Sequence, residues 1–113
     1  MFAILLFLSN IAVCVGTFAG KYSDPNHPGC ARRIAFETTS SARVFGADAA
    51  GGEGVSCDGE TDLPWGPLPA TVNGAQIVVD FSSKGGPSNL AGKYDEVQEK
   101  INWQDGNAWT KIL

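Results

Sequence analysis

The sequence predicts an all-β domain, a small antiparallel meander that closes into a β-barrel or folds into a sandwich. Glycine and proline are frequent, with 14 and 6 of them, and they divide the chain into short segments. Several segments alternate apolar and polar residues, which is the period of a half-buried strand. After the N-terminal segment, no stretch keeps helical periodicity beyond about one turn. Because a meander of short strands must cover its edges, we expect it to close into a barrel or to form two packed sheets.

The N-terminal segment differs from the rest of the chain. Residues 2–19 are almost entirely apolar, and no acidic or basic residue precedes Lys21. This composition is typical of a secretory signal peptide, although the usual basic residue at its start is missing. We expect residues 1–19 to be the signal peptide and residues 20–113 a single domain, with cleavage after Gly16 as an alternative. An uncleaved membrane anchor is a further alternative, because the apolar run is as long as the shortest membrane-spanning helices.

The expected domain retains two cysteines, Cys30 and Cys57. A domain this small buries a modest fraction of its surface, so a cross-link matters for its stability. A disulfide between the two would add about 3.5 kcal/mol on chain-entropy grounds. The alternatives are two free thiols, or metal ligation together with His27, for which the C-x-x-C spacing of common zinc sites is missing.

About seven strands are expected, most of them paired with their sequence neighbours. Gly46 is expected to mark a bulge and Gly92 a close approach of backbones or rings. Asn73-Gly74 is a strong hairpin signal, and residues 82–89 are expected to form a hairpin loop. The expected strands cover residues 32–38, 42–49, 55–59, a short edge strand within 60–72, 75–81, 90–95, 97–104 and 108–113.

The strand expected at 97–104 has one apolar and one uniformly polar face, so one side is covered and the other is wet. Trp103 lies on the covered side and is expected in the core. Glu99 falls on the same side, where a carboxylate needs a partner or has a raised pKa. We expect it either to pair with Arg33 or Arg43 or to be a polar group inside a ligand pocket.

Aromatic residues are the first candidates for a site, because their faces bind sugars and other flat or apolar ligands. The side of the sheet that Trp109 occupies depends on the preceding turn. A two-residue Asp105-Gly106 turn, which Asp-Gly favours, places Trp109 on the wet face, whereas a three-residue loop including Asn107 places it beside Trp103. Core packing is the alternative for each aromatic candidate. The expected ligand-binding residues are Trp65, Tyr94, Glu99 and Trp109.

Composition and motifs argue against several function classes. The net charge is −4 without a basic cluster, so neither nucleic acid nor an anionic membrane is an expected partner. His27 near Asp24 could act as an acid or base, but no nucleophile accompanies it, and we expect neither enzymatic activity nor a cofactor. Asp58, Glu60 and Asp62 alternate but depart from the EF-hand loop, which predicts a solvated turn rather than a calcium site.

The C-terminal segments LAGKYD, VQEKINW and DGNAWTKI resemble the closing strands of lipocalin-like and avidin-like up-and-down barrels. Those proteins also run a Gly-x-Tyr/Trp strand into hairpins that carry tryptophan. The resemblance implies a barrel architecture, and it carries no particular function, because one fold hosts many activities.

These features predict a secreted, non-enzymatic binding module for a small molecule or glycan, with no membrane contact after signal cleavage. The abundance of tryptophan and loop glycine without a catalytic constellation supports this reading. One alternative is a structural or protein-interaction protein of the cell surface or matrix without a ligand pocket. Another is a small hydrolase that uses His27. An open or a filled interior would separate the first two.

Overall fold

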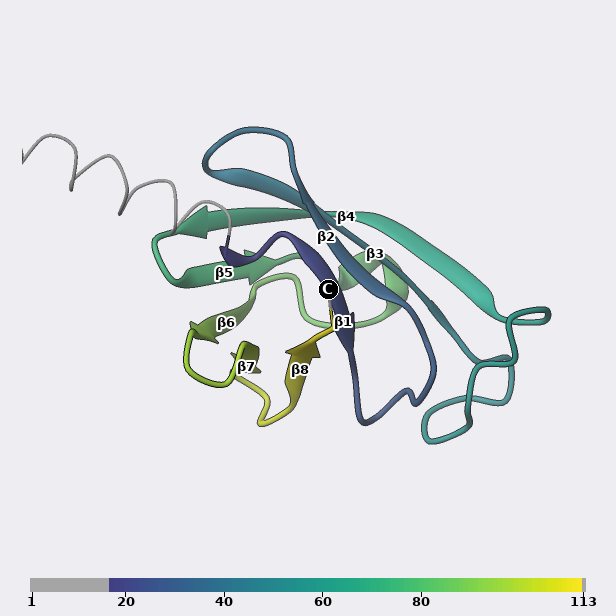
Figure 1. Ribbon diagram of the computed structural model, residues 1–113. Coiled ribbons are helices and arrows are strands. Elements are labelled where there is room, and N and C mark those ends of the chain that lie inside the picture. The colour runs from purple at the N-terminus through teal and green to yellow at the C-terminus, as the bar shows by residue number, and fades with distance from the viewer. Residues whose placement is uncertain (1–16, 113) are drawn as a thin grey trace, which may run out of the picture.

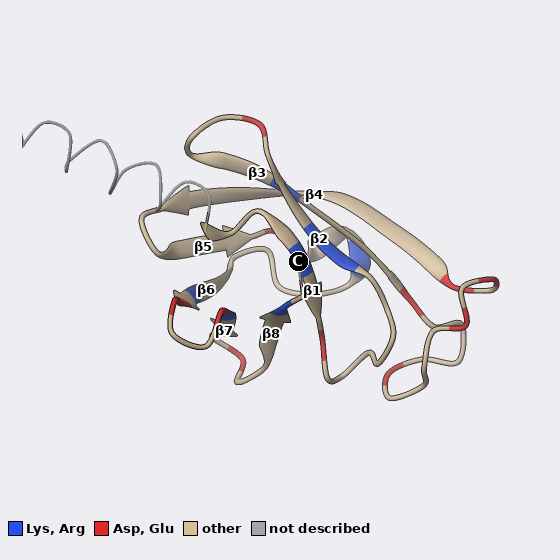
Figure 2. Ribbon diagram, viewed as in Figure 1, with Lys and Arg blue, Asp and Glu red and all other residues tan. Residues whose placement is uncertain are grey.

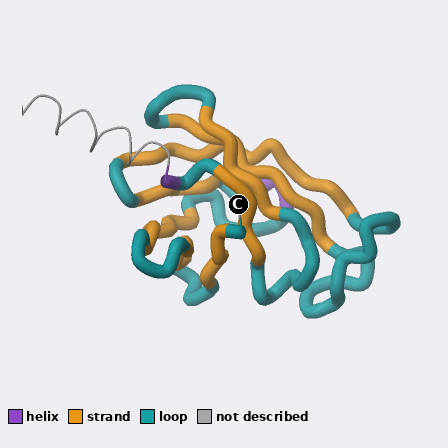
Figure 3. Tube along the Cα trace, viewed as in Figure 1, coloured by secondary structure: helices purple, strands orange, loops and turns teal. Residues whose placement is uncertain are grey.

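The computed structural model describes residues 17–112, which form a closed, eight-stranded antiparallel barrel (Figure 1). Each strand pairs with its sequence neighbours, and β8 returns to pair with β1. Figure 3 shows that helix is limited to short turns. The all-β meander is confirmed, with barrel closure rather than a sandwich. The elements are β1 (Gly20–Ser23), β2 (Arg32–Phe36), β3 (Ser41–Asp48), β4 (Leu63–Asn73), β5 (Gln76–Val79), the 3-10 helix η1 (Ser82–Lys84), β6 (Leu90–Asp95), β7 (Lys100–Trp103) and β8 (Ala108–Lys111).

The middle of the barrel is filled by aliphatic side chains from alternate strand positions. Ile34, Val44, Leu68, Ile77 and Ile101 are each at most 2 % exposed and belong to a single cluster. Burying a side chain of this size contributes roughly 1.5–3 kcal/mol. The closed middle therefore stabilises the fold and leaves room for an interior ligand site only at the two ends.

The β3–β4 ribbon extends past the barrel, as Figure 1 shows. The first half of β4 pairs with β3 alone, since β5 pairs with β4 only from Ala70 onward. Pro64 and Pro67 lie in this one-sided half, where a missing N–H costs no ladder bond to β5. The short edge strand expected within residues 60–72 is thus one long strand, of which the first half behaves as an edge.

The loop at 49–62 is fastened to the arm that follows β1. A disulfide joins Cys30 to Cys57 with Cα atoms 5.0 Å apart, as predicted. Next to it, the Cys57 amide donates to the Pro28 carbonyl at 3.0 Å. The strand predicted at residues 55–59 is wrong, because this segment crosses the arm instead of joining the sheet.

Two glycines allow aromatic rings to lie against the backbone; the bulge at Gly46 and the close approach at Gly92 are both confirmed. The β3–β4 register shifts between Val44 and Gly46, and a Cβ at Gly46 would collide with the ring of Trp65. A Cβ at Gly92 would come within 2.8 Å of Trp103 ring atoms. Real Cβ atoms do not approach other atoms so closely, so these positions require glycine.

The β6–β7 connection corrects the prediction for Glu99. The Asp95 carboxylate accepts hydrogen bonds from the amides of Val97 and Gln98, at 2.9 and 3.1 Å, which folds residues 96–99 into a turn. Glu99 has φ 52° and is exposed, and Val97 is 93 % exposed. The strand predicted from residue 97 therefore begins only at residue 100, and Glu99 is not on the covered face.

The β7–β8 hairpin decides the position of Trp109. The Trp103 amide donates to the Asn107 carbonyl at 2.9 Å, so these two residues lie opposite each other and the loop that they close has three residues, 104–106. Gly106 has φ 94°, the left-handed conformation that closes a three-residue hairpin. Trp109 consequently faces the interior opposite Ile101. The two-residue turn is wrong, and the loop starts earlier than in the three-residue alternative.

One end of the barrel is sealed by Phe18, Tyr22 and Tyr94, and we call it the closed end. Phe18 is fully buried, its ring lies edge-on to Tyr94 at 5.5 Å, and its carbonyl accepts the Tyr22 hydroxyl at 2.7 Å. The signal-peptide prediction falls mostly on residues 1–16, which lie outside the described residues. Phe18, which precedes the predicted boundary at residue 20, is packed in the core.

Candidate functional site

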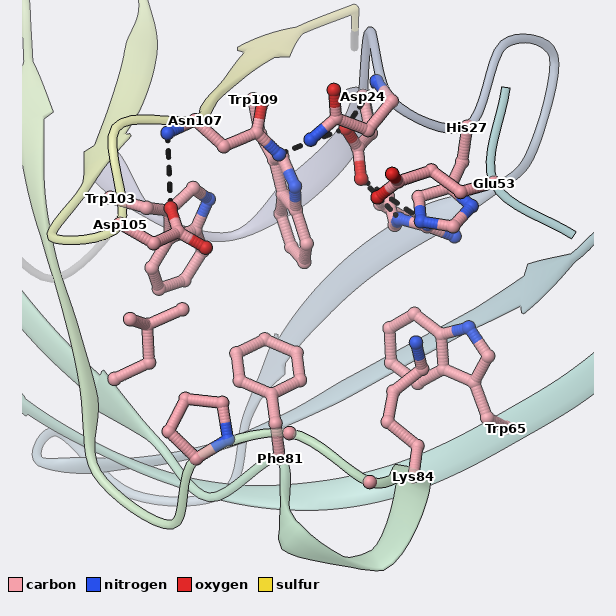
Figure 4. Close-up of a pocket in the computed structure, with 16 residues that line it drawn as sticks. Asp24, His27, Glu53, Trp65, Phe81, Lys84, Trp103, Asp105, Asn107 and Trp109 are labelled. Carbon is pink, nitrogen blue, oxygen red and sulfur yellow. Dashed lines mark hydrogen bonds and ion pairs between the residues drawn. The ribbon is translucent and has the colours of Figure 1, made fainter.

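The end opposite the closed end contains a cavity of about 330 Å³, and we call this end the mouth (Figure 4). Its walls come from the arm after β1, the start of β4, the segment after β5 and the β7–β8 hairpin. Figure 2 shows acidic residues in the loops that follow β1, β3 and β7. A volume of a few hundred Å³ suits a small-molecule ligand.

Four aromatic rings line the mouth, and three of them are the only tryptophans of the chain. Phe81 lies at the centre, with ring centroids 5.9 Å from Trp103, 6.3 Å from Trp109 and 6.4 Å from Trp65. Trp103 and Trp109 are 4.9 Å apart, and all four contacts are edge-on. The rings form one connected wall on which an apolar or flat group could stack.

Arg32 brings a buried charge into this aromatic wall. It is 2 % exposed, and its guanidinium carbon lies 5.1 Å from the Trp65 ring centroid and 5.7 Å from that of Trp109. Such contacts are favourable because the ring faces carry negative charge density. The guanidinium therefore fixes two tryptophan rings that come from β4 and β8.

The donors of Arg32 are used within the protein. Nε donates to Asp24 Oδ2 at 3.2 Å, and Nη2 donates to Asp48 Oδ1 at 2.9 Å while lying 3.2 Å from Asp24 Oδ2. Nη1 donates to the carbonyls of Ala31 and Ala47 at 3.1 and 2.6 Å. Arg32 thus organises the mouth rather than offering a charge to a ligand.

Asp48 joins Arg32 to the other cation of the mouth. Lys84 Nζ lies 2.9 Å from Asp48 Oδ2, and the Trp65 indole N–H donates to Oδ1 at 3.1 Å. Burial alone would raise the pKa of Asp48, but the hydrogen bonds from Lys84 and Trp65 and the charges of Lys84 and Arg32 outweigh burial and lower it to about 2. The carboxylate is therefore ionised at neutral pH.

Asp24 ties the arm to the closing hairpin. It is 5 % exposed, and its Oδ1 accepts the Asn107 side-chain amide at 3.0 Å and the Asn26 backbone amide at 2.9 Å. Its other oxygen accepts from Arg32. These bonds satisfy a carboxylate that would otherwise be costly to bury.

Two buried nitrogen atoms at the mouth have no hydrogen-bond partner within the described part of the chain, Trp103 Nε1 and His27 Nδ1. His27 Nδ1 lies 3.5 Å from Asp48 Oδ1, without hydrogen-bond geometry. A buried polar group without a partner costs about 1–3 kcal/mol. Because an indole nitrogen can only donate a hydrogen bond, the Trp103 N–H group needs an acceptor oxygen or nitrogen.

The structure brings two of the four predicted site residues together. Trp65 and Trp109 both line the mouth. Tyr94 lies at the closed end, on a crevice of about 20 Å³ that has room for about one water molecule. Burial first, and then the charges of Glu99 and Glu96, raise the pKa of Tyr94. Neither Tyr94 nor Glu99 lines the mouth, so their placement in one site with the tryptophans is wrong.

The other candidates from the sequence have structural explanations. His27 lines the mouth, but none of the described lining residues there is a serine, threonine, cysteine or tyrosine. The two cysteines are in a disulfide, so the zinc alternative is wrong. Asp58 and Asp62 accept hydrogen bonds from amides of their own turn. Within residues 17–112, no group of three or more His, Cys, Asp or Glu residues is placed to hold a metal ion.

Sequence reasoning missed much of the polar wall. For Arg32 a signal existed, since it lies two residues before Ile34 and so shares the inward face of β2. Phe81 likewise continues the alternation of β5. Asp24, Lys84 and Asn107 lie on irregular segments, where alternation predicts no direction, and tertiary packing alone brings them together.

Comparison with protein-family models, curated proteins and solved structures found no match. Over residues 17–112, no helix has the length and apolar character needed to cross a membrane.

Proposed function

We propose that the protein is a secreted, non-enzymatic binding module that takes a small molecule or a short glycan at the mouth. The observation that carries the proposal is the indole N–H of Trp103, which is buried without an acceptor beside an aromatic-walled cavity. Buried donors nearly always have partners, and a ligand oxygen would supply this one. Stacking on the neighbouring rings would add apolar contact.

Two features support the proposed compartment. The protein has a disulfide between Cys30 and Cys57. Disulfides persist in oxidising compartments and are rare in cytosolic proteins. The apolar segment before Lys21 has the composition of a signal peptide.

Tryptophan fluorescence is a specific reporter for this proposal, because all three tryptophans line the mouth. A groove of about 600 Å³ on the outer face of β1–β3 has no tryptophan in its lining. We expect titration with a panel of sugars, amines and flat heterocycles to change the emission saturably for at least one class. A panel without any response would overturn the proposal.

Two variants locate the binding site. Trp65→Phe removes an indole at the mouth, and we expect it to weaken binding about tenfold, which corresponds to about 1.4 kcal/mol. Tyr94→Phe changes an aromatic residue at the closed end, and we expect it to leave affinity unchanged. Isothermal titration calorimetry measures both, and equal losses in the two variants would contradict binding at the mouth.

A protein-interaction function is the second candidate, because the outer groove has an apolar floor. Phe45, Ala47 and Ile112 line it, and Ile112 is 58 % exposed. This candidate would be favoured if no tested ligand changed the tryptophan emission and if an apolar dye bound to the protein. Phe45→Ser should then weaken binding of the dye, and Trp65→Phe should not.

A further inference from the structure

The charges around the mouth restrict the ligand that it can take. Three carboxylates line the cavity, those of Asp24, Glu53 and Asp105, and a fourth, that of Asp48, pairs with the two cations of the lining, Arg32 and Lys84. Arg32 is fully engaged with its own carboxylates and carbonyls. An anionic ligand would therefore enter a negative field and find no uncommitted cation.

Lys84 shows how an ammonium group is held here. Its Nζ lies 2.9 Å from Asp48 Oδ2 and 4.9 Å from the ring centroid of Trp65. A carboxylate on one side and an aromatic face on the other are the two groups that recognise organic cations. The Asp48 carboxylate and the Trp65 ring thus form a cation-binding site that the ammonium group of Lys84 occupies.

Lys84 is also placed so that it can leave. It is the last residue of η1, a single turn, and its side chain is 24 % exposed. The next residue, Gly85, has φ 90° and ends the turn in a left-handed conformation. Movement of this side chain toward solvent would free the Asp48 oxygen and the Trp65 face without disturbing a strand.

Two carboxylates at the rim are not engaged by any cation of the described residues. Glu53 and Asp105 are exposed, line the mouth and form no ion pair there. They add negative potential on the path into the cavity, whose inner wall includes Trp103 with its unpartnered N–H. A cation with an oxygen acceptor would satisfy both features.

We propose that the ligand is an organic cation, a protonated or quaternary amine that also carries a hydroxyl or carbonyl oxygen. Its ammonium group takes the place of Lys84 Nζ between Asp48 and Trp65, and its oxygen accepts the hydrogen bond from Trp103 Nε1. This inference rests on the proposed binding function and names the ligand class of the same site.

Matched probes test the charge requirement. Choline has both the cation and the hydroxyl, 3,3-dimethylbutan-1-ol is its neutral isostere, and tetramethylammonium lacks the oxygen; ethanolamine supplies a primary amine. By tryptophan fluorescence and calorimetry, we expect choline or ethanolamine to bind about tenfold more tightly than either partial analogue. Equal binding of the neutral isostere, or no binding of either amine, would overturn the inference.

Variants test the displacement of Lys84. Lys84→Met removes the tethered cation but keeps its stem, so we expect amine affinity to rise about fivefold and affinity for the neutral isostere to stay the same. Lys93→Met, on the exposed side of β6, is the matched control and should change neither. Weaker amine binding in Lys84→Met would contradict the displacement.

The rim variants Glu53→Gln and Asp105→Asn keep side-chain shape, and each is expected to weaken amine binding about twofold to threefold at low salt. They remain informative if Lys84→Met alters the local packing, and unchanged affinity in both would count against the inference. Saturable binding of neutral sugars without any amine binding would support the proposed binding function and reject the inference that the ligand is a cation. If no probe binds, both the proposed function and this inference are rejected.

Discussion

Aromatic rings occupy both ends of this barrel, with opposite results. At the closed end, Phe18 packs edge-on against Tyr94, and the buried Tyr22 hydroxyl donates to the Phe18 carbonyl. At the mouth, aromatic rings surround a buried guanidinium, and two buried nitrogens lack partners within the described chain. Natural sequences break packing rules mainly where function requires it, so the contrast supports the proposal that the mouth is the binding site.

The largest effect is expected from removing the cation that organises the mouth. Arg32→Met keeps a long apolar stem but leaves Asp24 and Asp48 without their buried counter-charge. Breaking a buried ion pair from one side costs about 3–5 kcal/mol, and we expect that loss of unfolding free energy in urea denaturation. The tryptophan emission of the folded variant should also change, because Trp65 and Trp109 lose their contact with the Arg32 guanidinium.

The neighbouring arginine is the control for this prediction. Arg33 is exposed on the outer face of β2 and forms no ion pair with a described residue. Arg33→Met removes an exposed contact with the Phe45 ring and should change stability by no more than about 1 kcal/mol. Similar losses for the two variants would mean that burial of Arg32 does not matter, and the contrast between the two ends would lose its basis.

The second effect tests whether the closed end serves stability alone. Phe18→Ala removes a fully buried ring, for which a loss of about 3 kcal/mol is expected. Because Phe18 does not line the cavity, the affinity of any mouth ligand should stay unchanged in the folded variant. Phe45→Ala, on the outer face, should cost less than about 1 kcal/mol.

Thermal denaturation and ligand titration of these two variants separate the functions of the ends. A Phe18→Ala protein with native stability would show that the domain does not need this residue and could start at Gly20. A Phe18→Ala protein that is stable enough to fold but binds more weakly would show that the two ends are coupled.

The barrel was largely predictable because strand alternation is a local property. In the segments Gln76–Val79 and Leu90–Asp95 the larger apolar residues recur at even spacing, and both are strands with the predicted inward residues. The register of Trp109 was not predictable in this way, because one residue of loop length reverses the face of every side chain that follows. Asp-Gly fits both a two-residue turn and a three-residue loop that ends on Gly106.

The site was less predictable than the fold, and the reason is physical. Trp65 and Trp109 could be named from composition, since aromatic residues are few and conspicuous. The ion cluster depends on Asp24, Asp48 and Lys84, which meet only after the arm, the β3–β4 ribbon and the segment after β5 are packed together. No local pattern in the sequence encodes that meeting.

The smallest expected effect concerns Glu99, whose position was predicted wrongly from the sequence. Glu99 has φ 52°, a conformation that disfavours L-residues by about 1 kcal/mol and that glycine adopts freely. Glu99→Gly should stabilise the domain by about 0.5 kcal/mol, because the relief of strain exceeds the added entropy of the unfolded chain. In a domain of this size, that gain raises Tm by about 2–4 °C. Gln98→Gly is the control, since its φ is negative and glycine there should lower Tm. If Glu99→Gly also lowers Tm, the turn at 96–99 is not strained, and the Glu99 side chain stabilises the turn in a way that its exposed position does not explain.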